Sequence, residues 1–256
     1  MKRYDLIDTL RGISIISMIA FHTCWLMNYF GIGLSDEIVY GTAFTVWERS
    51  ICISFIVIAG FSFSLGRHHL RSALLLSGIG LAITVITCLF FPDIRIVFGI
   101  LTFLGAAAFI MIFIDRVYKR AAKGNEEMSE PVNAGLLSLS LLLFIFTYNI
   151  NNGYIGISGI WSADMPKVLY NGYAATFIGF MKPDFTSADY FPLLPWIFIY
   201  MYGYFLHKAI MGSSRAKKSL RHGISWISFL GRHSLIIYLL HPVVIFLVLY
   251  AITVTS

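Results

Sequence analysis

The sequence predicts an all-α protein: a polytopic membrane helix bundle of about seven transmembrane helices, with the N-terminus cytoplasmic and the C-terminus outside. Three observations predict it: the composition, the spacing of apolar runs, and the uneven distribution of lysine and arginine. Of the 256 residues, 58% are hydrophobic and 12% are charged, whereas soluble domains carry about 25% charged residues. This composition excludes a disordered chain, a fibrous repeat and a disulfide scaffold. It also excludes a soluble nucleic-acid binder, despite a formal charge of +6.

Seven apolar runs are candidates for crossing a bilayer, whose core of about 30 Å requires roughly 20 residues per helix. They lie near residues 10–30, 43–65, 71–91, 96–118, 133–150, 191–211 and 234–253. Between the last two runs, residues 223–230 predict a short amphipathic interfacial helix that leads to a break at Gly231. Asp5, Asp8 and Arg11 interrupt the first run, so we do not expect a cleavable signal peptide there.

Positive charge predicts the orientation of the helices, because cytoplasmic loops are enriched in lysine and arginine. With the N-terminus inside, 13 cationic residues face the cytoplasm: Lys2, Arg3, Arg67, Arg71, Arg116, Lys119, Arg120, Lys123, Lys208, Arg215, Lys217, Lys218 and Arg221. Only 4 face the other side: Arg49, Arg95, Lys167 and Lys182. We therefore expect a multi-pass protein of the cytoplasmic membrane.

The chain is expected to form a single transmembrane domain over residues 1–256. Its longest non-membrane segment, roughly 151–190, is predicted to lie outside the cell and is too short for a core of its own. The three cysteines, Cys24, Cys52 and Cys88, stand inside apolar runs without the spacing of metal ligands. They are interpreted as small core residues, and no metal is expected.

The first predicted helix carries ionisable residues at membrane depth. Arg11 and His22 stand eleven residues apart, which is about three turns with roughly 20° of drift. Asp8 and Ser14 lie near the same line, and His22 is roughly 16 Å beyond Arg11, near mid-membrane. Such groups are costly in a bilayer and are candidates for function.

Two interpretations of this stripe stay open. In the first, it packs the helix into the bundle, Asp8 pairs with Arg11, and His22 only forms hydrogen bonds. In the second, the site is wet and a neutral His22 accepts a proton as a general base. A dry helix seam prefers small residues to ionisable ones, which favours the second interpretation.

Other polar residues give weaker signals. Arg67 and Arg71, four residues apart at the start of a predicted helix, suit phosphate binding, but they equally suit a positive-inside anchor. His241, followed by a helix-kinking proline, is a second imidazole at membrane depth. Asp189, ahead of the sixth run, suits a helix N-cap as well as a substrate ligand.

The residues Asp8-Thr9-Leu10-Arg11-Gly12, with His22 following, resemble the first-helix signature of transmembrane acyltransferases. Together with three further segments they resemble the heparan-alpha-glucosaminide N-acetyltransferase catalytic-domain family in its short bacterial form. The further segments are Phe98-Gly99-Ile100-Leu101 with Gly105, then 189–196, and Leu230-Gly231-Arg232-His233-Ser234-Leu235 running to Tyr238 and His241. The resemblance spans nearly the whole chain in order. One departure is Thr102, which stands where many relatives have histidine.

The resemblance implies transfer of an acetyl group from cytosolic acetyl-CoA to a hydroxyl or amine of a sugar or glycan on the far side of the membrane. It implies catalytic roles for His22, Arg11 and Asp8. The remaining implied roles are donor binding at Arg67, Arg71 and His241, and acceptor binding at Asp189 and Trp196. Direct transfer and an acetyl-histidine intermediate both stay open, and the implied partners are acetyl-CoA, a carbohydrate acceptor and the lipid bilayer, with no nucleic acid. A homodimer is compatible with the sequence.

Two other classes of protein compete with this interpretation. One is a small proton-coupled secondary transporter or exporter that uses His22, Asp8 and His241 as a proton relay. It predicts internal repeats and broken helices in both halves, and no convincing repeat is found in the sequence. The other is a structural or sensory membrane subunit without chemistry. Acetyl transfer from acetyl-CoA distinguishes the enzyme from both.

Overall fold

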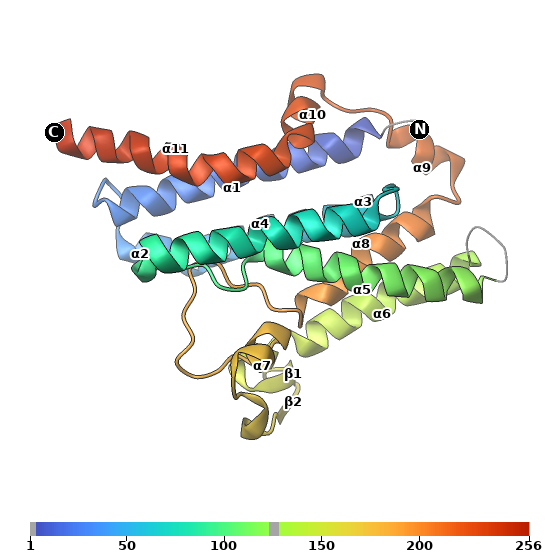
Figure 1. Cartoon of the computed structure of the whole chain (residues 1–256). Coiled ribbons are helices and arrows are strands. Elements are labelled where there is room, and N and C mark those ends of the chain that lie inside the picture. Colours follow the sequence, from blue (N-terminus) through green and yellow to red (C-terminus); the bar gives the residue numbers. More distant parts are fainter. Residues whose placement is uncertain (1–3, 123–127, 256) are drawn as a thin grey trace. The chain divides into compact units, whose positions relative to one another are not determined.

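The structure is a computed structural model that describes residues 4–122 and 128–255. It is predominantly helical (Figure 1) and divides into two compact units. The first unit comprises Met1–Ile58 and Ser213–Ser256, and the second comprises Ala59–Gly212. Three of the cationic residues used to predict the orientation, Lys2, Arg3 and Lys123, lie outside the described residues.

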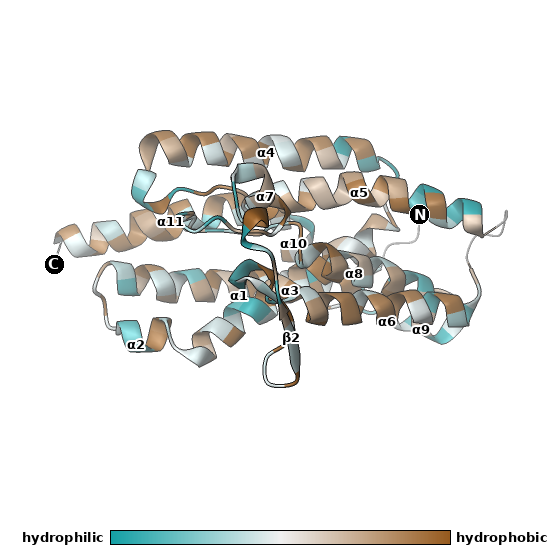
Figure 2. Cartoon of the chain, turned by 90° about the horizontal axis from the view of Figure 1, so that it is seen from below, coloured by the Kyte–Doolittle hydropathy of each residue, from teal (hydrophilic) through white to brown (hydrophobic). Residues whose placement is uncertain are grey.

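Six helices of the described residues are long and apolar enough to cross a membrane. They are α1 (Asp5–Tyr29), α3 (Thr42–Phe63), α4 (His69–Phe90), α5 (Ile100–Ala121), α6 (Glu130–Thr147) and α11 (Ser234–Thr255). Figure 2 shows hydrophobic residues along these helices and hydrophilic ones mainly near helix ends and in connecting segments. The prediction of an all-α, multi-pass membrane protein is confirmed.

The run predicted at 191–211 forms a shorter helix, α8 (Trp196–Ile210). Its 15 residues span about 22 Å at 1.5 Å per residue, less than the bilayer core. The first residues of the run are not helical because Pro192 and Pro195 stand among them. Proline lacks the backbone donor and disfavours the α conformation in the residue before it.

In the first unit, α1 packs against α10 (Ser225–Arg232), α11 and the short α2 (Asp36–Val39). Ile15 and Met18 of α1 form a buried cluster with Ile51 of α3. The indole of Trp47 donates to Ser17 Oγ at 2.9 Å. Ile15 and Met18 therefore anchor α1 in the core of the first unit.

The segment that returns to α11 contains α9 (Ser214–Ser219) and α10. The helix predicted at 223–230 is α10, shifted by two residues. Gly231, predicted to break this helix, lies inside it, and the boundary with α11 falls at His233. The glycine serves close packing against α1, as described below.

In the second unit, α4 packs along α5, and α6 along α8. The α4–α5 seam uses small residues, which let helix backbones approach closely. A Cβ on Gly80 of α4 would lie 2.7 Å from the backbone nitrogen of Thr102, and one on Gly105 of α5 would lie 2.7 Å from that of Ser77. Thr102 therefore belongs to the α4–α5 seam.

The segment near 151–190, predicted to lie outside the cell, forms several short elements. They are η2 (Ile150–Asn152), β1 (Tyr154–Ile157), β2 (Trp161–Asp164), η3 (Lys167–Leu169) and α7 (Tyr173–Ile178). The strands pair antiparallel, with Tyr154 opposite Asp164 and Ile157 opposite Trp161. This β-hairpin was not predicted from the sequence. It directly follows α6 and contacts it.

Candidate functional site

The polar group at the start of α1, Asp8 with Arg11, is held in a seam with α10. Asp8 is buried, and its Oδ1 accepts a hydrogen bond from Arg11 Nη1 at 3.2 Å. Arg232, at the end of α10, places Nε 3.9 Å from the other carboxylate oxygen. One carboxylate thus lies between two guanidinium groups. The predicted Asp8–Arg11 pair exists, with a second arginine added from a segment far along the chain.

A hydrogen-bond network fixes α10 on α1. The hydroxyl of Thr9 donates to the carbonyl of Asp5 at 3.0 Å and accepts from the backbone nitrogen of Ile224 at 3.0 Å. The two hydroxyl oxygens of Thr9 and Ser228 lie 2.7 Å apart, and Ser228 also reaches the carbonyl of Asp5 at 3.1 Å. Each of these polar groups is buried or partly buried, and each has a hydrogen-bond partner within the network.

Glycines make this approach possible. A Cβ on Gly12 would collide with the backbone oxygen of Ile227, and one on Gly231 would collide with the backbone oxygen of Asp8. A Cβ on Gly223 would lie 2.6 Å from the backbone oxygen of Asp5. The glycines of the two family-like segments therefore allow the backbones of α1 and α10 to touch, which positions Arg232 beside Asp8.

The second polar group of α1, nearer its C-terminal end, is a histidine pair. The ring centroids of His22 and His241 lie 5.0 Å apart with planes inclined by 53°, and α1 packs on α11. Phe21 meets His22 edge-on at 5.6 Å. Two residues predicted separately, one as catalytic and one as donor-binding, are thus adjacent.

The hydrogen bond of His241 defines its tautomer. Its Nδ1 lies 3.1 Å from the carbonyl oxygen of Ile237, and because a carbonyl can only accept, Nδ1 carries the proton. In the neutral ring, Nε2 then holds a lone pair. His241 is 6% exposed, and its Nε2 has no hydrogen-bond partner among the described residues. A buried basic nitrogen therefore lies beside His22.

The two polar groups lie at different levels of α1. Fourteen positions separate Asp8 from His22, which corresponds to about 21 Å along the helix. Between them, Ser14 turns back to donate to the carbonyl of Leu10 at 3.0 Å. The three residues predicted as catalytic therefore do not meet at one point: Asp8 and Arg11 lie at the α10 seam, and His22 lies with His241.

The two arginines predicted to bind phosphate lie in the second unit. Arg67 is in the turn between α3 and α4, Arg71 is in the first turn of α4, and both are exposed. Between them, His69 stacks on Phe63 with ring centroids 4.1 Å apart. The two guanidinium groups are accessible to an anion.

Asp189 caps a helix, although not the one expected. Its Oδ2 accepts from the backbone nitrogen of Ile100, the first residue of α5, at 3.0 Å. Two further bonds join these segments: Phe191 N to Phe98 O at 2.9 Å and Ala188 N to Arg95 O at 2.9 Å. Phe98 has a φ of 59°, a left-handed conformation that is uncommon for a bulky residue. The Asp189 segment and the family-like segment at Phe98 therefore form one structural element.

Trp196, predicted to contact the acceptor, is 2% exposed. Its ring packs against Phe191 at 5.0 Å and Phe144 at 5.7 Å. Nearby, the hydroxyl of Tyr190 donates to the carbonyl of Thr176 at 2.7 Å, and burial raises the pKa of Tyr190. The phenol therefore stays neutral at physiological pH and acts as a donor within the loop.

Sequence reasoning missed one residue of the polar group around Asp8. Arg232 was part of a family-like segment, yet it was left without a role because its partner Asp8 is distant in sequence. Within the described part of the chain, no three His, Cys, Asp or Glu residues are grouped to hold a metal ion.

The comparisons with known proteins identify a family for the chain. The family model described as heparan-alpha-glucosaminide N-acetyltransferase, catalytic, matches residues 3–124 and 133–243. The match contains both polar groups of α1, the Asp189 segment and His241. No curated protein and no solved structure matches the chain. The predicted resemblance is confirmed: the chain belongs to the heparan-alpha-glucosaminide N-acetyltransferase catalytic-domain family, a family of membrane acetyltransferases.

Proposed function

We propose that the protein transfers an acetyl group from cytosolic acetyl-CoA to a hydroxyl or amine of a sugar or glycan on the extracytoplasmic side of the cell membrane. His22 serves as the general base or the acyl carrier. The observation that carries this proposal is the His22–His241 pair, which puts two imidazoles side by side in helices long and apolar enough to span a membrane. Family membership supplies the reaction class.

In the direct mechanism, the acceptor oxygen or nitrogen attacks the thioester carbonyl while its proton passes to the imidazole of His22. The tetrahedral intermediate then collapses, the carbon–sulfur bond breaks, and the imidazolium returns the proton to the CoA thiolate. In the covalent alternative, an imidazole nitrogen attacks the thioester carbonyl first and expels the CoA thiolate. The acceptor then attacks the acetylated imidazole, its proton passes to the thiolate, and the free imidazole is restored. Both routes require a neutral imidazole at the start.

His241 supplies a second basic ring nitrogen beside His22. Because its Nδ1–H is held by Ile237, its Nε2 lone pair is available to hold the proton of His22 or of the acceptor. We assign His241 this positioning and proton-holding role in place of the donor contact expected from the sequence. Without His241, His22 would lose the neighbouring ring nitrogen that can hold this proton.

The donor is a polyanion, so its binding residues should be cationic and accessible. Arg67 and Arg71 satisfy this condition, because both are exposed at the start of α4. Arg11 and Arg232 both lie beside the Asp8 carboxylate, and we assign this group to positioning the donor rather than to the reacting atoms. Guanidinium groups bind phosphate through paired, charge-assisted hydrogen bonds.

The charge distribution supports the sidedness of the reaction. The last turn of α5 carries Lys119 and Arg120, that of α8 carries Lys208, and α9 carries Lys217 and Lys218. If α8 is counted as a seventh span, the C-terminal ends of α5 and α8 lie in the cytoplasm together with α9. The C-terminus of the chain then lies outside. The donor is cytosolic, and the acceptor then lies on the opposite face.

The test is acetyl transfer in membranes that contain the overexpressed protein, with radiolabelled acetyl-CoA and glucosamine as the first acceptor. We expect a labelled N-acetylated sugar and one CoA thiol released per acetyl group transferred. The control is the same membrane preparation without the protein. Acetyl-CoA-independent proton transport, with neither labelled product nor thiol release over a panel of sugars and glycans, would contradict the proposal.

A further inference from the structure

The β-hairpin formed by β1 and β2 carries an apolar tip that is largely exposed. Ile157, Ile160 and Trp161 are 44%, 80% and 54% exposed. From Pro131 to Ala163 the sequence contains no aspartate, glutamate, lysine, arginine or histidine. The spanning helix α6 and the hairpin tip thus form one uncharged stretch, although the tip lies beyond the end of the helix. A tip bathed in water would be expected to carry polar or charged residues.

The lipid-facing surface of α6 can be identified from its burial pattern. Asn133, Ser140 and Phe144 are buried. Asn133 accepts a hydrogen bond from Tyr118 of α5 at 2.8 Å, and the ring of Phe144 packs against Trp196 of α8, so this side of α6 faces other helices. Leu139, Leu142 and Phe146 are exposed, and they follow the helical spacing of a single face. In a spanning helix this exposed apolar face contacts lipid. Phe146 is its last member, one residue before the helix ends at Thr147.

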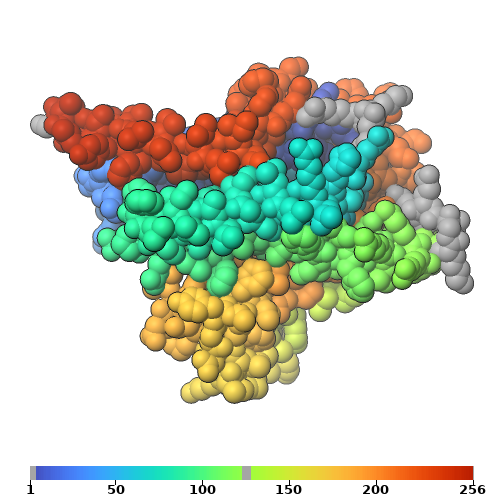
Figure 3. All heavy atoms as spheres, viewed as in Figure 1, coloured from blue at the N-terminus to red at the C-terminus, as the bar shows by residue number. Residues whose placement is uncertain are grey.

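The hairpin extends this lipid-facing surface. The ring of Trp161 stacks on that of Phe146, with centroids 5.4 Å apart and planes inclined by 14°. The stack requires Gly156: with a φ of +100°, it lies where a Cβ would come within 2.9 Å of the Trp161 ring. Trp161 is therefore held at the depth of the last turn of α6. Figure 3 shows the segment that contains the hairpin (yellow) as a lobe beside α6.

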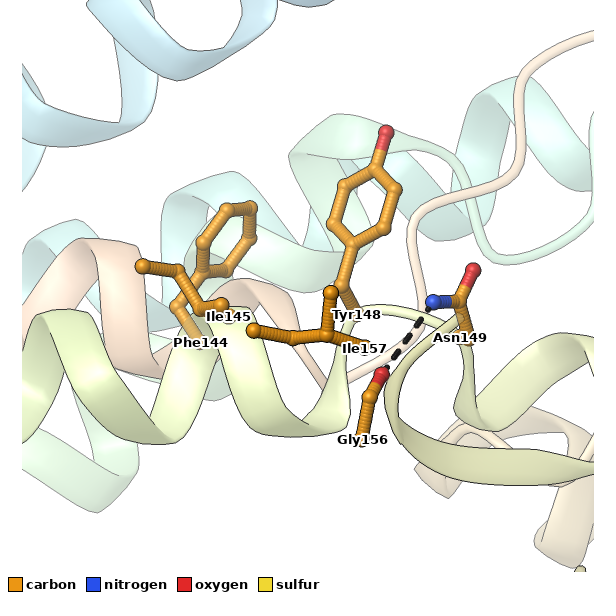
Figure 4. Close-up of a pocket in the computed structure, with 6 residues that line it drawn as sticks. All are labelled: Phe144, Ile145, Tyr148, Asn149, Gly156 and Ile157. Atoms are coloured by element: carbon orange, nitrogen blue, oxygen red, sulfur yellow. Dashed lines mark hydrogen bonds between the residues drawn. The ribbon is translucent and has the colours of Figure 1, made fainter. Parts of the chain in front are cut away.

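An apolar cavity lies where the hairpin meets α6. It has a volume of about 200 Å³ and is lined by Phe144, Ile145, Tyr148, Asn149, Gly156 and Ile157. Figure 4 shows the side chains of α6 facing Ile157, with the amide of Asn149 donating to the carbonyl of Gly156 at 3.4 Å. Most of this lining is apolar, so an acyl chain suits the cavity better than a sugar.

We propose that the β-hairpin is a membrane-interface anchor. Its tip, Ile157–Trp161, lies at the boundary between headgroups and acyl chains in the leaflet where α6 ends, and a lipid acyl chain occupies the cavity between α6 and β1. Tryptophan prefers this depth because its ring is apolar and its N–H is polar. The occupant is bilayer lipid, and the inference does not depend on the acetyl acceptor or on which face of the membrane is cytoplasmic.

The first test uses spin labels in the full chain, reconstituted in phospholipid nanodiscs after the three native cysteines are replaced by alanine. Labels are placed by Ile160→Cys, by Leu142→Cys as the lipid-facing control, and by Asp184→Cys as the exposed polar control. We expect the Ile160→Cys label to resemble the Leu142→Cys label, accessible to oxygen and protected from a water-soluble nickel chelate. Accessibility to the chelate equal to that of Asp184→Cys would overturn the proposal. Protection from both reagents would also overturn it, because a protein would then cover the tip.

A second test uses the chain with its native cysteines. Phospholipids brominated near the middle of the acyl chain quench tryptophans that contact lipid. We expect the quenched fraction of the fluorescence to fall in Trp161→Phe relative to the parent. Trp196→Phe, which removes a buried indole, is the matched control and should leave the quenched signal unchanged. Equal quenching of the parent and Trp161→Phe would place the indole outside the lipid.

Discussion

Thr9 is the residue through which the contact between α1 and α10 can be tested most sharply. Thr9→Val keeps the shape of the side chain and removes its hydroxyl. The backbone N–H of Ile224 then loses its acceptor, which now lies at 3.0 Å, and Ser228 loses its 2.7 Å partner. Ser228 can still donate to the carbonyl of Asp5, so the main cost is one unsatisfied N–H, worth about 1–3 kcal/mol.

The matched control is Thr23→Val in the same helix. The hydroxyl of Thr23 donates only to the carbonyl of Ile19, one turn earlier, at 2.8 Å, so its loss strands no donor on another segment. Reversible unfolding in mixed detergent micelles, followed by circular dichroism, measures both variants. We expect Thr9→Val to lower the free energy of unfolding by about 1–3 kcal/mol and Thr23→Val to lower it by much less. Equal effects would refute the reasoning that Thr9 joins α10 to α1.

Three further predictions concern the remaining site residues and the topology. Replacing Arg67 and Arg71 together by alanine should raise KM for acetyl-CoA by roughly tenfold or more, since even one charge-assisted phosphate contact contributes about 1.5–3 kcal/mol. An unchanged KM in steady-state assays would leave the two arginines as positive-inside anchors. Asp189→Ala should lower stability by about 0.5–2 kcal/mol, whereas Asp189→Asn should retain the cap; a loss of activity in Asp189→Asn with stability retained would show that the carboxylate contacts the acceptor. Cysteine-accessibility labelling should place residues 119 and 217 in the cytoplasm and residue 167 outside, and labelling of 119 and 167 from one side would contradict the direction of transfer.

Much of the fold could be predicted because the bilayer imposes a simple rule on the sequence. Runs of apolar residues long enough to span it have few alternatives to helix, and six of the predicted spans are helices of sufficient length. Prolines moved the start of α8, and the β-hairpin was missed because its short strands stand in a segment without strict alternation. Gly153, Gly156 and Gly159 all have positive φ, and their spacing was the available signal.

The site was predictable in its residue types and less so in its grouping. The stripe on the first helix indicated Asp8, Arg11 and His22 through periodicity alone. Which residues from distant segments would join them depends on helix packing, which one chain's periodicity does not encode. Arg232 and the His22–His241 contact are of this kind, as is the capping of α5 by Asp189.

The turnover of His22→Ala, compared with that of His241→Ala and His222→Ala, tests the central claim most directly. His222 is an exposed histidine on a surface segment and serves as the matched control. With purified, folded proteins and acetyl-CoA as donor, we expect His22→Ala to lose about 10²–10⁴-fold in kcat, the usual contribution of a general base, while CoA binding survives. His241→Ala should lose less, and His222→Ala should resemble the parent. The parent's activity should also fall toward acidic pH, because a protonated imidazole cannot accept the acceptor's proton. If His22→Ala retained turnover within a few-fold of the parent, the account would be contradicted and His22 would be a packing residue of α1.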